Sequence, residues 1–232
     1  MVRSTGLAIV AGVIAGLAGW DGATAADRVH PTVVELFQSQ GCSSCPPANA
    51  NLLALADRPD LLALSWQVTY WDQLGWTDTF GKAAFTDRQR DYARAFGRDQ
   101  VFTPEIVVNG RADVVGNRRD ELEALISRAD RGEGGPAIML SGTGVTVSAA
   151  PSGAIVLLVR YDPHVIQVPI ARGENGGRTL PHRNVVRDVA LLGTSDGRTR
   201  SYALPAASRN GLRTAVLVQD GSGGAILGAA GD

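Results

Sequence analysis

The period of apolar and polar positions changes several times along the chain, and each change predicts an element. Residues 31–38 are rich in β-branched and aromatic side chains and predict a strand, and residues 61–68 predict a second, buried strand. Between them, residues 48–56 carry leucines at helical spacing and predict a helix. The segment 31–68 therefore predicts a strand–helix–strand unit.

Two more helices and a hairpin are predicted before residue 131. A capping-box pattern predicts a helix that begins at Thr86, and apolar residues at helical spacing predict another over 120–129. Between these helices, Asn109 and Gly110 separate two apolar runs, which is the strongest short-range signal for a β-hairpin. Residues 26–131 thus predict one α/β domain.

The pattern changes after a glycine-rich linker at 132–136. Short alternating apolar runs follow, separated by Gly, Pro, Asp and Asn, at 137–140, 145–147, 155–161, 165–170, 185–192, 200–204, 215–218 and 225–227. Strands at this spacing predict a small antiparallel β-sandwich domain over 137–232.

The first 25 residues predict a cleaved signal peptide. Arg3 precedes an apolar run of 15 residues, Gly6–Trp20, and Ala23-Thr24-Ala25 fits an A-x-A cleavage site. The run is shorter than the roughly 20 residues that span a bilayer. We expect a mature chain that begins at Ala26 in the periplasm or outside the cell; the alternative is an uncleaved N-terminal anchor.

Composition and charge narrow the range of partners that the protein is expected to bind. With 22 basic and 23 acidic residues the formal net charge is −1, and no basic block occurs, so nucleic acid is not expected as a partner. No segment of the mature chain is expected to span a membrane. The oligomeric state is not determined by these features.

The sharpest chemical feature is the pair Cys42 and Cys45, the only cysteines in the chain. They stand three residues apart where the first strand gives way to the first helix, and two prolines suited to a first helical turn follow. A thiolate at a helix N-terminus has a lowered pKa, and a second thiol three residues on can resolve a mixed disulfide. We therefore expect Cys42 to be the exposed nucleophile and Cys45 to be the shielded resolving thiol.

Two other interpretations of the pair stay open. A structural disulfide is one, although closing a loop of about four residues stabilises by only ~2 kcal/mol in the chain-entropy picture. A metal site is the other, but the histidines His30, His164 and His182 show no ligand spacing. No metal and no cofactor is expected.

The order strand, CxxC, helix, strand, helix, hairpin, helix resembles the thioredoxin fold. That resemblance implies a cis proline opposite the dithiol, and Thr103 and Pro104 stand at the matching place, where they would bind substrate. It also implies a buried acid on the strand before CxxC. Glu35 is the candidate for assisting proton transfer, one residue farther from Cys42 than is usual; the alternative is a glutamate facing solvent or paired with an arginine.

Longer stretches resemble a bacterial secreted family catalogued as domain of unknown function 1223. They are 33–49, 69–80, 85–93, 101–111, 177–188 and 215–230. The resemblance implies a thioredoxin-like domain in an exported protein and brings no substrate with it. One position departs from the family pattern, since Thr69 stands where an acidic residue is common.

Two further segments have a functional and a plain interpretation. Trp71, in the aromatic connection 69–82, either lines a substrate surface beside the dithiol or packs the connection onto the domain. The polar segment 172–188 is either a recognition loop or a solvated hairpin with arginine–carboxylate pairs.

Two functions follow from these features. The first is an exported thiol–disulfide oxidoreductase that acts on protein or peptide thiols and disulfides. The second is a secreted binding protein on a thioredoxin scaffold, in which the CxxC disulfide is passive and the β domain recognises the partner. The direction of electron flow and the physiological substrate cannot be determined from these residues.

Overall fold

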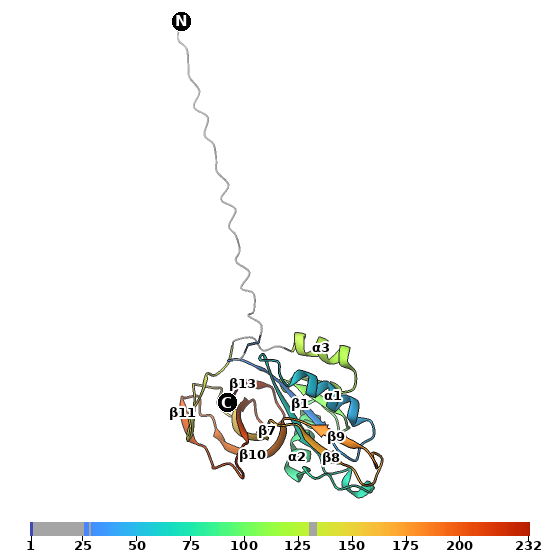
Figure 1. Ribbon diagram of the computed structural model, residues 1–232. Helices are drawn as coiled ribbons and strands as arrows, with labels where there is room; N and C mark the ends of the chain where they lie inside the picture. Colours follow the sequence, from blue (N-terminus) through green and yellow to red (C-terminus); the bar gives the residue numbers. More distant parts are fainter. Residues whose placement is uncertain (2–25, 28, 130–133) are drawn as a thin grey trace.

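The computed structural model describes residues 1, 26–27, 29–129 and 134–232 (Figure 1). The predicted signal peptide, apart from Met1, lies outside the described residues. The N-terminal half contains β1 (Thr32–Gln38), α1 (Cys45–Leu55), β2 (Leu61–Gln67), the short 3-10 helix η1 (Asp72–Leu74), α2 (Ala83–Ala95), β3 (Glu105–Val108), β4 (Ala112–Val115) and α3 (Arg119–Arg128). The C-terminal half contains β5 (Ile138–Leu140), β6 (Gly144–Val147), β7 (Ile155–Asp162), β8 (Ile166–Pro169), β9 (Thr179–His182), β10 (Val185–Thr194), β11 (Arg200–Ala203), β12 (Arg213–Gln219) and β13 (Ile226–Gly231).

The chain forms a mixed α/β structure around one large sheet. Eight strands follow the order β13-β12-β7-β10-β2-β1-β3-β4, and two small antiparallel sheets, β11-β6-β5 and β8-β9, accompany it. In the N-terminal half β1 is parallel to β2 and antiparallel to β3, and β4 closes that edge. In the C-terminal half β10, β7, β12 and β13 are antiparallel neighbours.

The two halves share this sheet through β2 and β10. The strands are parallel with Val185 opposite Ser65, and the Ser65 N–H donates to the Asn184 carbonyl oxygen at 2.9 Å. The predicted separation into two sheets is therefore wrong, because a strand of the C-terminal half extends the N-terminal sheet. The predicted sandwich is present only in part: the β11-β6-β5 sheet packs on β7 and β12 through an apolar cluster. The boundary at 132–136 stays a prediction, with residues 130–133 outside the described part.

The helices lie on both faces of the sheet (Figure 1). On one face α1 and α3 cover β1 and β3 in a fully apolar cluster that includes Leu36, Leu52 and Ile106. On the other face α2 packs through Phe85 and Tyr92 against strands of both halves, because the C-terminal strands curve round toward it. The arrangement places the end of β1 and the start of α1 at one edge of the molecule. Within the described part of the chain, no helix is long and apolar enough to cross a bilayer.

The predicted Asn109-Gly110 hairpin is confirmed. Both residues have positive φ, 49° and 61°, as a tight turn between right-twisted strands requires. A Cβ at Gly110 would lie 2.3 Å from the Gly224 carbonyl oxygen, so only glycine fits. The Asn109 side-chain oxygen accepts from the Val33 N–H at 2.8 Å, and its carbonyl oxygen accepts from the Ile226 N–H at 2.8 Å. The turn thus holds β1 and β13 together.

Two local predictions need correction. Helix α2 begins at Ala83 rather than Thr86, because the Thr86 hydroxyl is used elsewhere: it accepts from the Thr69 N–H at 3.0 Å. Strand β9 was not predicted, since its four residues lie inside the polar segment 172–188.

Candidate functional site

The cysteine pair lies between β1 and α1, as predicted. Cys42 and Cys45 form a disulfide with Cα atoms 5.4 Å apart, and the Cys45 N–H donates to the Cys42 carbonyl oxygen at 3.2 Å. Cys45 is the first residue of α1, so the disulfide sits at the positive end of that helix. The Ser44 hydroxyl lies 3.2 Å from the Cys42 sulfur. Strand, tight loop and helix together position both sulfurs.

Both cysteines are buried, which contradicts the expectation of an exposed Cys42. Cys42 is 0% exposed and Cys45 is 1% exposed, although Ser43 and Ser44 between them are exposed. The prediction considered only the local strand-to-helix turn. Residues more than 130 positions further along the chain also bind the backbone around Cys42.

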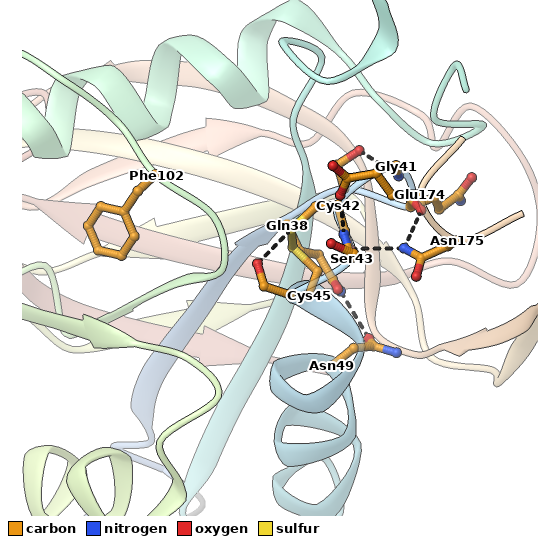
Figure 2. The surroundings of a disulfide bond; sticks show 12 residues. Gln38, Gly41, Cys42, Ser43, Cys45, Asn49, Phe102, Glu174 and Asn175 are labelled. Carbon is orange, nitrogen blue, oxygen red and sulfur yellow. Dashed lines mark hydrogen bonds between the residues drawn. A yellow bond between two sulfur atoms is a disulfide. The ribbon is translucent and has the colours of Figure 1, made fainter. Parts of the chain in front are cut away.

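The connection between β8 and β9 folds against the Gly41–Ser43 segment (Figure 2). The Asn175 side-chain amide donates to the carbonyl oxygens of Gln40 and Cys42, each at 2.9 Å. The Glu174 carboxylate accepts from the Ser43 N–H at 2.9 Å. Hydrogen bonding by the Ser43 side chain, and then by this N–H, keeps the pKa of Glu174 below its usual value. The C-terminal half therefore contributes directly to the surroundings of the disulfide.

The aromatic connection 69–82 also lies beside the CxxC segment. A Cβ added at Gly41 would lie 3.6 Å from the Trp71 Cβ, so Trp71 stands beside the CxxC segment. Trp71 is also half-buried against the main apolar cluster. It therefore both packs the connection onto the domain and lies beside the CxxC segment. The Trp76 indole N–H donates to the Gln40 side-chain oxygen at 3.0 Å.

Asp78 in the same connection is a buried acid near the dithiol. It is 4% exposed, and one carboxylate oxygen accepts from the Gln40 N–H at 2.7 Å. Burial raises its pKa to about 6. The sequence motif that contains Asp78 supported the family resemblance, but nothing in it singled out this residue.

Beneath Cys45 lies a group of buried polar side chains. Gln38 donates to the Asn49 side-chain oxygen at 2.9 Å and to the Ser65 hydroxyl at 2.8 Å, and Asn49 donates to the Pro181 carbonyl oxygen. Figure 2 shows Gln38 and Asn49 close to the disulfide. These bonds attach β1, α1 and β2 to β9, and so hold the base of the β8–β9 hairpin on the site.

His182 of β9 is 1% exposed, and neither ring nitrogen has a hydrogen-bond partner among the described residues. Its ring meets Phe80 edge-on at 5.9 Å between centroids. Burial lowers the pKa of His182 to about 4, so the imidazole is neutral at physiological pH. The described residues hold no group of three or more His, Cys, Asp or Glu side chains able to bind a metal ion.

The Thr103-Pro104 peptide bond is cis, as predicted. Because Phe37 pairs with Glu105, Pro104 lies level with the end of β1 from which the CxxC segment departs. Glu105 is fully buried and accepts from Arg98 at 2.6 Å, yet burial raises its pKa to about 7. The hydroxyl of Thr103 has no partner among the described residues.

Glu35 lies elsewhere and pairs with an arginine. Arg88 of α2 donates to both carboxylate oxygens, at 2.7 and 2.9 Å, and the Tyr92 hydroxyl donates to one of them. Glu35 is 0% exposed and Arg88 is 8% exposed. Its side chain points to the α2 face together with Val33 and Phe37, so this structure favours the arginine-paired alternative over a proton-transfer role.

Comparison with known proteins places the chain. Residues 33–219 match a family described as "Protein of unknown function (DUF1223)". The chain belongs to this family. Among solved structures, the DUF1223 chain resembles protein AGR_C_4864 from Agrobacterium tumefaciens, with 32% identity and a TM-score of 0.72 over 90% of this chain and 95% of that one.

A second solved structure, HBP35 of Porphyromonas gingivalis, matches 91% of the DUF1223 chain and 76% of its own, with a TM-score of 0.56. At 8% identity this likeness concerns the fold alone. No curated protein matches significantly.

Long-range contacts explain which site residues were missed. Glu174 and Asn175 lie in the segment that was predicted to be either a recognition loop or a solvated hairpin. It is a hairpin with an exposed tip, and two of its residues reach the dithiol. A Glu-Asn pair flanked by glycines was the only local sign, and it does not indicate a target.

Proposed function

We propose that this DUF1223 protein is an exported thiol–disulfide oxidoreductase whose reactive group is the Cys42–Cys45 pair. We further propose that residues 26–129 form a thioredoxin-like unit, on which the C-terminal strands are built. The substrates are thiols or disulfides of proteins or peptides.

One observation carries the proposal: a CxxC disulfide at the N-terminus of α1 stands at the same sheet edge as the cis Thr103-Pro104 bond. The strand order β2-β1-β3-β4, with β1 parallel to β2 and the other pairs antiparallel, is the order expected of a thioredoxin-like sheet. A purely structural disulfide at this place would stabilise the protein little, because it closes a loop of only four residues.

The chemistry follows from the helix end. In the reduced state a thiolate on Cys42 would lie at the positive end of the α1 dipole, which stabilises negative charge. That thiolate attacks a substrate disulfide and forms a mixed disulfide, and Cys45 then displaces the substrate thiol. In this scheme Pro104 shapes the groove and Trp71 borders it, whereas Glu35 has no part because Arg88 holds it.

A second function is favoured by one specific observation, the burial of both cysteines. A disulfide without exposed sulfur can serve as a passive brace. The protein would then bind a partner through another surface, with no exchange chemistry.

Trapping separates the two functions. The Cys45→Ser variant should accumulate a mixed disulfide on Cys42 when mixed with reducible exported proteins, because no thiol remains to resolve it. Cys42→Ser is the matched control and should trap little. Non-reducing electrophoresis with mass spectrometry reads out both variants. Equal trapping by the two variants, or none by either, would favour the passive disulfide.

A further inference from the structure

The connection between β8 and β9, residues 170–178 and here called the cover loop, determines access to the disulfide. We propose that Asn175 is a positioning residue that holds the cover loop against the CxxC segment and so keeps thiols from the Cys42 sulfur until the loop opens. This inference rests on the proposed function and adds the step that controls it.

The loop is held over the site mainly by its polar contacts. Asn175 is 0% exposed in an otherwise exposed tip, and both of its amide hydrogens point to main-chain oxygens of the CxxC segment. Its side-chain oxygen accepts from Arg178 at 2.7 Å, so every polar atom of the side chain is used. Glu174 adds one bond, to the Ser43 N–H. Figure 2 shows Glu174 and Asn175 turned toward the segment that carries Cys42.

The base of the loop is anchored differently. Val168, Ile170 and Leu180 form an apolar cluster with Trp76 and Phe80. The tip has no such cluster. It contains three glycines, of which Gly173 and Gly177 adopt φ of about 80°. Gly173 also packs against Gly75 and Trp76. Opening the tip therefore breaks a few hydrogen bonds and this one contact, and it leaves the apolar base in place, which is the pattern of a local opening.

Access matters because exchange requires contact with sulfur. A thiolate must reach the Cys42 sulfur, form a new S–S bond there and release the electron pair to the Cys45 sulfur, which takes up a proton. A second thiol then attacks the mixed disulfide, and the two thiols leave as one disulfide while the protein gains two thiols. With both cysteines at 0–1% exposure the first attack cannot begin in the closed state.

The test measures reduction of the oxidised, full-length mature protein by 2-mercaptoethanol under native conditions. Asn175→Ala removes both bonds to the CxxC segment, and at about 1 kcal/mol per bond the rate should rise roughly tenfold or more. Arg172→Ala, on the same loop but exposed, is the matched control and should reduce at the wild-type rate. In strong denaturant all variants should react equally, since the loop no longer covers the sulfur.

Glu174→Ala provides an independent arm, because Glu174 is exposed and its loss does not threaten folding. Its rate should rise about fivefold, for one bond lost. Equal reduction rates under native conditions for the wild type and both variants would overturn the access role. The oxidoreductase function would still stand in that case if the Cys45→Ser variant traps a substrate. A wild-type rate as fast in native buffer as in denaturant would overturn it too. Failure of every folded variant to react natively would overturn both proposals.

Discussion

Replacing Arg88 by methionine should destabilise the protein far more than removal of an ordinary ion pair. The Arg88 guanidinium is buried, with two bonds to Glu35, one to Gln219 at 3.0 Å and one to the Tyr92 hydroxyl at 2.8 Å. It also stacks over the Trp66 ring, 5.1 Å from its centroid. A single side chain of α2 thus joins β1 of the N-terminal half to β12 of the C-terminal half.

The magnitude follows from what the substitution leaves behind. Methionine fills much of the arginine volume, but Glu35 would keep a buried carboxylate whose remaining partner is the Tyr92 hydroxyl. Breaking a buried pair by removing one partner costs about 3–5 kcal/mol. Replacing both partners is much less costly, so Glu35→Leu combined with Arg88→Met should recover most of the loss.

Urea denaturation followed by circular dichroism measures the free energy of unfolding of each variant. Arg90→Ala is the matched control, because Arg90 lies on the same helix and makes an exposed pair with Asp87 at 3.2 Å. Exposed pairs of this kind contribute about 0.5 kcal/mol or less. The reasoning is refuted if Arg88→Met costs no more than Arg90→Ala, or if the double variant is less stable than Arg88→Met.

Two pH-dependence predictions have opposite signs. Burial raises the pKa of Glu105 in the folded protein to about 7, above its unfolded value near 4.5. Stability should therefore be lost as pH rises from about 4.5 to 7. Thermal melts of the Glu105→Gln variant should not show this loss. The folded pKa of His182, lowered by burial to about 4, lies below its unfolded value near 6.5, so stability should be lost as pH falls from about 6.5 to 4. The His182→Leu variant should lose less stability than the wild type as pH falls through this range. An unchanged loss would show that His182 does not titrate as its burial requires.

Features that depend on a few neighbouring residues were predictable from the sequence. The CxxC turn and the Asn109-Gly110 hairpin follow from local backbone preferences, whereas the Thr103-Pro104 cis bond was implied by the thioredoxin resemblance. The alternating apolar runs of the C-terminal half predicted strands correctly for the same reason, because alternation is a local pattern. The predicted start of α2 was wrong because the Thr86 hydroxyl binds Thr69, and strand β9 was missed because it lies in a polar segment.

Pairing between distant segments could not be predicted in the same way. The run that begins at Val185 alternates like any strand, and alternation does not indicate that its neighbour is β2 rather than a strand of its own half. Likewise Glu35 could have met solvent or an arginine, and only the fold brings Arg88 across from 53 residues away. The site is therefore half predictable: its cysteines were found, and its cover was not.

Three contacts make the C-terminal half part of the candidate site rather than an appendage to it. Val185 extends the sheet beside β2, Gln219 completes the Arg88 cluster behind β1, and Asn175 covers the cysteine pair. Each contact joins a different layer. The C-terminal half therefore cannot move as a rigid body and break one of these contacts without breaking the others. In the proposed mechanism the movement that would uncover sulfur is confined to the glycine-rich tip of the cover loop. The proposed exchange at the N-terminal dithiol would therefore depend on C-terminal residues, since Glu174 and Asn175 bind the segment that carries Cys42.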